Sequence, residues 1–150
     1  MAFEYADNLL VARKLLRSPI PRVRCACHRT AVSRSYYAVY PRAEEIKRVL
    51  CARDSLMKES FRLKVQQEKE RRERKRERQI GSHEVTILFF QEALGSDEVF
   101  QLLEELRRLR TDADYYADRS IDRTDAGIAI KYAQRVRPLL ETIEQKYAGP

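Results

Sequence analysis

The sequence predicts an all-α protein, an up-and-down bundle of four to five main helices that forms one domain over residues 1–150. Only four glycines and five prolines interrupt the 150 residues, and 35% of the chain is charged. Leu, Ala, Arg and Glu, which favour helices, are abundant. No segment of strand length alternates apolar with polar residues. These observations together favour helices as the elements that build the core.

The first two helices are predicted on either side of a proline-rich break. Apolar residues recur every three or four positions over 2–17, and the SPIP stretch at 18–21 ends this pattern. A second helix is predicted over 23–40. The helical pattern resumes after Pro41 and continues to Met57, so we expect Pro41 to kink a helix that runs on.

A strongly charged segment follows, EKERRERKRER at 68–78, with seven basic and four acidic residues. Charges three or four positions apart pair on a helix, and without an apolar stripe the segment cannot pack on a core. We predict an exposed helical extension or a frayed loop, within an insertion at about 55–80. One interpretation is a solubilising helix, and the other is a phosphate-binding arm. The contacts of such an arm would come from Lys69, Arg71, Arg72, Arg74, Lys75, Arg76 and Arg78.

Three further helices are predicted from caps and apolar stripes. Ser82 caps the first of them and Gly95 ends it. The next begins at 96–98. Its apolar stripe is Val99, Leu102, Leu103, Leu106 and Leu109. Thr124 caps the last helix, which Pro138 is expected to kink. The inner face of this helix is expected at Ile128, Tyr132, Val136, Leu139, Leu140 and Ile143.

Charge and cysteine content restrict the class of protein. The formal net charge of +7 suits a polyanionic partner without naming one. The N-terminus carries acids and no run of about 18 apolar residues is present, so we expect a cytoplasmic protein without a signal peptide or membrane partner. Cys25 and Cys27 would point about 200° apart on a helix, which predicts buried thiols and no metal site. No cofactor is expected, because no cofactor-binding motif is present.

Four fragments form a recognisable pattern in order along the chain. They are AVSRSYYAVY at 31–40, SHEVTILFF at 82–90, LRRLRTDADYYAD at 106–118, and AGIAIKYAQRVRPLLETIE in the last helix. The first resembles the signature A-x-S-R-x-Y-Y-A-x-F-H of the HEPN (higher eukaryotes and prokaryotes nucleotide-binding) family. The second resembles that family's helix beginning T-H-x-G-V, and the third, with Asp114 and Tyr115, its helix end L-R-x-x-A-D-Y. The fourth resembles its closing helix, so the resemblance covers the chain apart from about 55–80.

The resemblance implies a small helical bundle that forms a homodimer. Many HEPN relatives are metal-independent endoribonucleases, often toxins beside a nucleotidyltransferase-like antitoxin, with an R-x4-6-H motif shared between two protomers. Matched to this motif, the arginine is Arg34 and the histidine position holds Pro41. On one continuous helix, seven residues advance about 700°, so both would share a face about 10 Å apart. Because proline cannot transfer a proton, the resemblance implies that the catalytic histidine is lost.

Other side chains are candidates for the same site. Arg34 is expected either to bind phosphate or to pair with a carboxylate such as Asp114. Tyr37, about one turn further on, is expected either to bond a phosphate or base or to serve in packing. If the chain is active, His83 is the candidate that replaces the missing acid–base group beside Arg34. Asp112 and Asp114 are expected to cap the helix end or pair with arginines.

Three functions stand as hypotheses. The first is a degenerate RNase-like protein that binds RNA, a nucleotide or a partner protein without cleavage. The second is an active endoribonuclease toxin of a toxin–antitoxin or defence system, and the third is a structural subunit of a larger helical assembly. A homodimer through the second and last helices is expected, because Tyr36, Tyr37 and Tyr40 would suit an interface.

Overall fold

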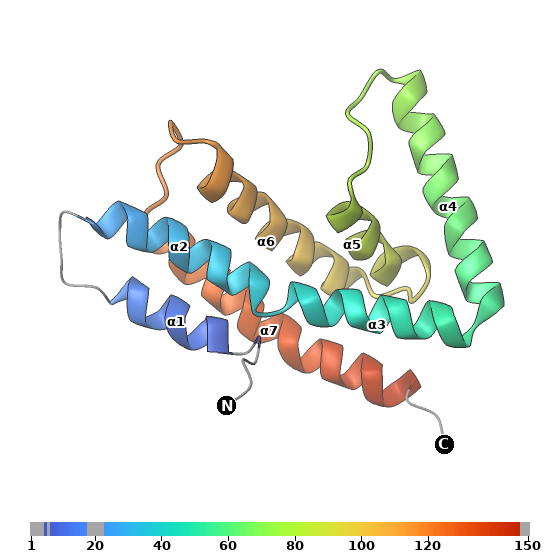
Figure 1. The fold of residues 1–150 in the computed structure, drawn as a ribbon, viewed down its shortest axis with the longest axis horizontal. Helices are drawn as coiled ribbons and strands as arrows, with labels where there is room; N and C mark the ends of the chain where they lie inside the picture. The colour runs from blue at the N-terminus through green and yellow to red at the C-terminus, as the bar shows by residue number, and fades with distance from the viewer. Residues whose placement is uncertain (1–4, 6, 18–22, 148–150) are drawn as a thin grey trace.

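The computed structural model describes residues 5, 7–17 and 23–147, and this part of the chain contains seven helices and no strand (Figure 1). The helices are α1 (Asp7–Leu16), α2 (Arg24–Tyr37), α3 (Tyr40–Arg53), α4 (Ser55–Arg74), α5 (Ser82–Glu92), α6 (Asp97–Tyr115) and α7 (Arg123–Tyr147). The all-α class is confirmed, with more helices than the four to five expected. No helix in the described part has the apolar length that crossing a bilayer requires. Most of residues 2–6, predicted to begin the first helix, lie outside the described residues.

The core lies where α2, α6 and α7 meet, and α1 packs on α2 (Figure 1). The apolar stripe of α6 is buried as predicted, apart from Leu109, which is half-buried. The buried face of α7 matches the predicted one only at Val136 and Leu140. It is formed by Ala126, Ala129, Ile130, Ala133, Val136 and Leu140. The predicted residues that lie half-buried beside it are Ile128, Tyr132, Leu139 and Ile143. Alanines let α7 approach its neighbours closely, which a search for large apolar residues misses.

The chain breaks where one continuous helix was predicted. α2 ends at Tyr37, Ala38 and Val39 form a turn, and α3 begins at Tyr40. Pro41 stands in the first turn of α3, where N–H groups have no intrahelical acceptor and a missing N–H costs nothing. The expectation of a kink within one helix is therefore wrong, because Pro41 stands at the start of a new helix.

α3 and α4 are also separate helices, joined at Asp54, whose carboxylate accepts a hydrogen bond from the Met57 N–H at 2.9 Å. We call α4 and the loop after it, residues 55–81, the charged arm, and Figure 1 shows it standing out from the body. Among the residues of α4, all of which are described, only Phe61 is buried. Its ring packs edge-to-face on Phe89, with centroids 5.2 Å apart. The predicted exposed helical extension is present.

α5 begins after Gly81, so the prediction that Ser82 caps it is wrong. The Gly81 N–H donates to the Glu84 carboxylate at 3.0 Å, and this side chain from inside the first turn replaces a cap. Gly95 closes the end of the helix as predicted. Its φ is +62°, and its N–H donates to the carbonyl of Gln91 at 3.0 Å.

α7 is capped by Asp122, so the prediction that Thr124 caps it is also wrong. The Asp122 carboxylate accepts hydrogen bonds from the N–H groups of Thr124 at 2.6 Å and Asp125 at 3.0 Å. Pro138 lies inside the helix and does not end it, since α7 continues to Tyr147.

Two expectations about single residues are wrong. All three cysteines are free, but Cys25 is exposed and Cys27 and Cys51 are half-buried, so they are not buried thiols. Tyr36 and Tyr40 are buried and stacked on each other, with ring centroids 5.1 Å apart. Both rings are part of the chain's own core, so they do not form the open tyrosine face on which the dimer interface was argued.

Candidate functional site

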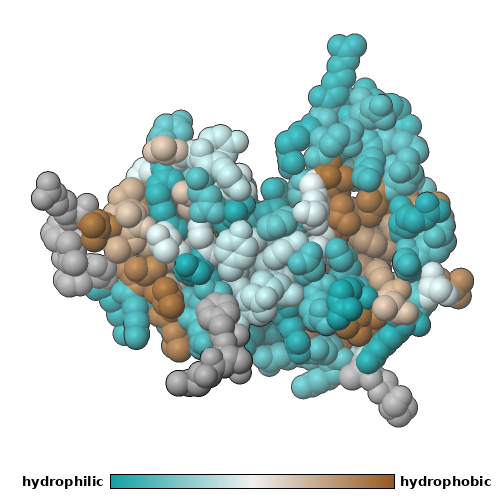
Figure 2. Space-filling model, in the orientation of Figure 1, coloured by the Kyte–Doolittle hydropathy of each residue, from teal (hydrophilic) through white to brown (hydrophobic). Residues whose placement is uncertain are grey.

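Two open grooves share the C-terminal half of α6 as a wall. The first groove, of about 550 Å³, lies between α2 and α6, and the second, of about 440 Å³, lies between α6, the start of α5 and the loop of the charged arm. Figure 2 shows the molecule hollowed between α6 and the charged arm. The polar residues of the first groove considered below are Arg29, Ser33, Arg34, Tyr37 and Asp114. Those of the second groove are Arg78, His83, Glu84, Arg107 and Arg110.

Arg34 lines the first groove from an exposed position on α2. One guanidinium nitrogen donates to Asn8 Oδ1 at 3.2 Å, and Asn8 Nδ2 donates to the carbonyl of Tyr37 at 3.4 Å. Asn8 is a buried residue of α1, so this helix helps to fix the orientation of the Arg34 side chain. Asp114 is bonded elsewhere, and the alternative that paired it with Arg34 is wrong.

Asp114 is held by two other side chains. The Ser33 hydroxyl donates to its carboxylate, and Arg110 Nε lies 2.7 Å from Asp114 Oδ2. The Arg110 Nε atom is buried. It forms an ion pair with Asp114, but its N–H does not point at an acceptor with the geometry of a hydrogen bond. Asp112 is paired with Arg119 at 2.6 Å. Of the two roles expected for these aspartates, capping the helix end or pairing with arginines, the structure shows the pairing.

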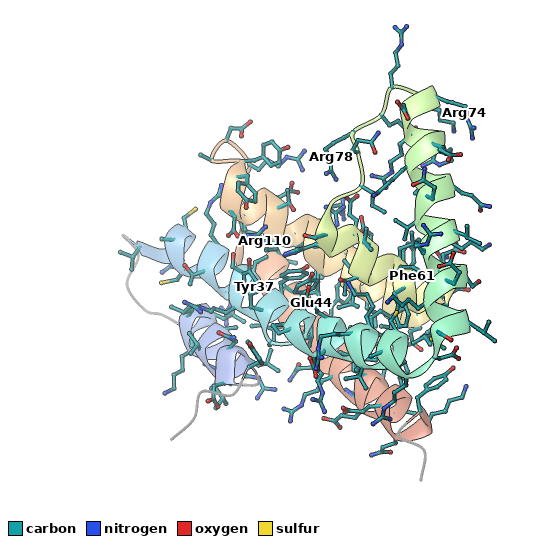
Figure 3. All side chains as sticks on the ribbon, turned by 45° about the vertical axis from the view of Figure 1, so that its right-hand side comes forward. Tyr37, Glu44, Phe61, Arg74, Arg78 and Arg110 are labelled. Atoms are coloured by element: carbon teal, nitrogen blue, oxygen red, sulfur yellow. The ribbon has the colours of Figure 1, made fainter. Side chains whose placement is uncertain are left out.

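Arg110 connects the two grooves. Its Nη2 donates to the Tyr37 hydroxyl at 2.9 Å, and its Cζ lies 5.5 Å from the centre of that ring and 5.0 Å from the centre of the Tyr115 ring. Figure 3 shows Tyr37 and Arg110 near each other. Tyr115 is 67% exposed. Arg110 therefore contacts a tyrosine of each groove, Tyr37 of the first and Tyr115 of the second.

The second groove carries more positive than negative charge. Arg78, Arg107 and Arg110 line it, and Glu84 is the one carboxylate among its described lining residues. Burial alone would raise the pKa of Glu84, but hydrogen bonds from Gly81 N–H and Arg78, with the charge of Arg107, outweigh burial and lower that pKa. The carboxylate therefore stays ionised at neutral pH and is already bonded by the protein.

His83 lines the second groove from the first turn of α5. Its Nδ1 lies 2.7 Å from the Tyr36 hydroxyl, and its ring stacks on Tyr40 with centroids 4.2 Å apart. Burial lowers the pKa of His83, and the nearby Arg110 lowers it further, so the imidazole is uncharged at neutral pH. Burial raises the pKa of Tyr36, and its phenol stays protonated.

Pro41 is not among the described residues that line either groove. Because α2 ends at Tyr37 and α3 begins at Tyr40, Arg34 and position 41 belong to separate helices. The argument that they share one face of one helix is therefore wrong.

The seven basic residues at 68–78 of the charged arm do not act as a set. Arg71 and Arg72 pair with Glu68 at 2.7 and 2.8 Å, and Arg72 also reaches Glu84 at 3.3 Å. Arg78 is the one of the seven that lines a groove. Figure 3 shows Arg74 at the far end of the arm. Of these seven, the ones that are exposed and have no ion pair within the described ranges are Lys69, Arg74, Lys75 and Arg76.

Arg107 and Arg110 are groove residues that the sequence interpretation missed. They lie on α6 between apolar residues of its stripe. In the sequence, charged residues at such positions indicate the solvent-exposed face of an amphipathic helix. The spacing of these residues could have indicated their role. Arg110 follows Arg107 by three positions and Asp114 follows Arg110 by four, so the three side chains lie next to one another along one side of the helix.

Arg29 fixes the end of α6, where these groove residues lie. Its two terminal nitrogens donate to five carbonyl oxygens in the last turn of α6 and in the loop that follows it. The acceptors are Asp112 at 3.2 Å, Ala113 at 2.7 Å, Tyr116 at 2.7 Å, Ala117 at 3.2 Å and Arg119 at 2.6 Å. The positions of Asp114 and Tyr115 therefore depend on a guanidinium of α2.

Within the described ranges, no three His, Cys, Asp or Glu side chains are grouped to hold a metal ion. Comparisons of the chain with protein-family models, curated proteins and solved structures found no match. The chemistry of the two grooves is therefore the basis for assigning a function.

Proposed function

We propose that the protein binds single-stranded RNA or a nucleotide across the two grooves and does not cleave it. The observation that carries this proposal is the junction at Arg110, where a guanidinium between two tyrosine rings joins the groove of Arg34 to that of Arg107. Guanidinium groups bind phosphate oxygens in fixed geometry, and exposed aromatic rings stack on unpaired bases.

The charges of the grooves favour an anionic ligand. Arg34 is exposed in the first groove, and Arg107 and Arg110 line the second. The carboxylates beside them, Asp114 and Glu84, are already held by arginines of the protein. Arg107 is paired with Glu104 at 2.6 Å, so of these three arginines Arg34 is the one that no described carboxylate pairs with. A ligand phosphate therefore meets no free carboxylate among the described lining residues.

The loss of cleavage follows from the groups near Arg34. The motif position holds Pro41, on another helix and outside both grooves. Asp114, the one carboxylate among the described residues of the first groove, is engaged by Ser33 and Arg110 and is not placed to accept a proton from a ribose hydroxyl. We therefore infer a HEPN-like protein that keeps the arginine of the motif and has lost its general acid–base.

One observation favours a second candidate, a His83-dependent endoribonuclease. An uncharged imidazole lines the second groove with Arg107 and Arg110, and a neutral histidine beside guanidinium groups has the components of a general base with phosphate stabilisation. RNA that is shortened by the purified wild-type protein but not by His83→Ala would establish this candidate. RNA that stays intact with both proteins removes it.

The proposed binding is tested by fluorescence anisotropy with a labelled single-stranded RNA at several salt concentrations. Arg34→Ala and Arg107→Ala should each weaken binding about tenfold at low salt, and each should lower the slope of log Kd against log salt by about one, because each loses a phosphate contact. Arg137→Ala is the matched control, an exposed arginine of α7 that pairs only with Glu141 at 3.2 Å. Equal binding by wild type and the two groove variants would contradict the proposal.

A homodimer and a nucleotidyltransferase-like antitoxin partner remain proposals that rest on the HEPN resemblance. Light scattering tests the first, since a dimer has twice the 17.7 kDa of one chain. We expect a dimer that persists at micromolar concentration, and a monomer would count against the resemblance.

A further inference from the structure

A third hollow, of about 280 Å³, lies apart from both grooves, at the end of α1 and the starts of α2 and α7. Figure 1 shows the start of α2 beside the end of α1, at the edge of the molecule away from the charged arm. Its described lining residues are Leu16, Arg17, Arg24, His28 and Arg123. No acidic side chain is among them.

The three arginines of this hollow differ from most arginines of the protein. Along α6, Arg107 and Arg108 each pair with a glutamate three positions earlier. In the described part of the chain, no carboxylate pairs with Arg17, Arg24 or Arg123. Three like charges around one hollow repel each other, and an anion between them would remove that repulsion.

The backbone adds positive potential at the same place. α2 begins at Arg24, and the side chain of Val23 before it accepts no hydrogen bond from the first N–H groups of α2. The start of a 14-residue helix of this kind attracts anions. α7 also begins at the hollow, with its first N–H groups satisfied by Asp122.

His28 gives independent evidence for a ligand. Its side chain lines the hollow although it is only 6% exposed, and the described residues offer it no hydrogen-bond partner. An anion in the hollow would accept the N–H of this ring, which the described residues leave without an acceptor. Asp122 carries the nearby negative charge, but its carboxylate already accepts two backbone N–H groups of α7.

We propose that this hollow binds a phosphate group through Arg17, Arg24, Arg123 and His28. The volume equals that of roughly nine water molecules at about 30 Å³ each, which exceeds the need of one phosphate and admits a diphosphate. Two sources share this chemistry, a small polyphosphate and the backbone of a bound RNA. The site is separate from the two grooves, so the proposed function does not depend on it.

The two histidines of the chain allow the sites to be observed separately. The sequence contains only His28 and His83, one in the hollow and one in the second groove. We expect titration with pyrophosphate to move the imidazole NMR signal of His28 in a saturable manner, with a smaller or no change for His83. His28→Gln assigns the signal. Absence of a saturable shift up to millimolar pyrophosphate at low salt would overturn the proposal.

Variants show whether the arginines carry the binding. Arg24→Ala and Arg123→Ala, both exposed and checked for folding by circular dichroism, should each raise the Kd for pyrophosphate at least about tenfold, since each loses a charge-assisted hydrogen bond to the anion. Arg137→Ala, on the same helix as Arg123, should leave the Kd unchanged. A loss that is equal in all three variants would identify general charge attraction and overturn the site.

A short single-stranded RNA then distinguishes the two sources. RNA that moves the His28 signal and competes with pyrophosphate identifies the RNA backbone as the source of the phosphate. RNA that moves only the His83 signal, while pyrophosphate still moves that of His28, identifies a small polyphosphate. RNA that moves neither signal counts against the proposed function but leaves the phosphate site standing.

Discussion

α4 and α6 have nearly the same length, 20 and 19 residues, and both are rich in Arg and Glu, yet they have opposite relations to the core. α6 places an apolar residue against the core at every turn of its stripe, whereas α4 buries only Phe61. Charged residues occupy the remaining faces of both helices. The difference shows that the spacing of leucines, and not the content of charge, decides which helix belongs to the body.

The largest effect is expected on the free energy of unfolding, when a buried leucine of α6 and an exposed leucine of α4 are each replaced by alanine. Leu106 is fully buried and Leu63 is 51% exposed. Leu106→Ala should lower the free energy of unfolding by about 2–5 kcal/mol, because it leaves a cavity in the core. Leu63→Ala should stay within about 0.5 kcal/mol of wild type. Urea denaturation followed by circular dichroism measures both, and similar losses in the two variants would show that the charged arm is part of the cooperative core.

A smaller effect on stability is expected at the C-terminal ends of α6 and α4, which are held in different ways. The end of α6 is held by Arg29, through five carbonyl oxygens, whereas the end of α4 continues into an exposed loop. Arg29→Ala should cost about 1–3 kcal/mol and increase hydrogen exchange at residues 112–119. Arg29→Lys should restore little, because a single ammonium nitrogen cannot reach five acceptors. Unchanged exchange at 112–119 would show that packing alone fixes this end.

The smallest expected effect concerns the charges that support α4. Hydrogen bonds from Arg71 and Arg72 lower the pKa of Glu68 from its ordinary value of 4.5 to about 2. The ionised form is therefore favoured in the folded helix, and its contribution is present above pH 4.5 and lost as the pH falls towards 2. That contribution is below about 1 kcal/mol for a partly exposed pair. NMR of α4 amides in wild type and Glu68→Gln measures it, and identical acid titrations of both proteins would contradict it.

The features that could be predicted from the sequence are those with a local cause. The stripe of α6, the glycine at the end of α5 and the ion pairs of α4 all depend on residues within four or five positions of each other. The break at Ala38 and Val39 has no such signal, since neither residue disfavours a helix strongly. Pro41 just after it fits the interior of a kinked helix as well as the start of a new one.

The candidate site was predicted in part for the same reason. Arg34, Tyr37 and His83 were expected from fragments of sequence, and each lines a groove. The role of Arg110 as the junction depends on Tyr37, 73 positions away, and only the packing of α2 on α6 brings them together. Contacts at this separation leave no periodic pattern in the chain.

The local pairing within α4 has a practical consequence for anyone who modifies this protein. Arg62 pairs with Glu59, and Arg71 and Arg72 pair with Glu68. In each of these pairs both residues belong to α4 and lie three or four positions apart. Beyond Phe61, the ion pairs between the arm and the body are those of Lys64 with Glu92 and of Arg72 and Arg78 with Glu84, and none involves residues 74–77. Residues 74–77, at its tip, are accordingly the place to graft a fluorophore or an affinity tag.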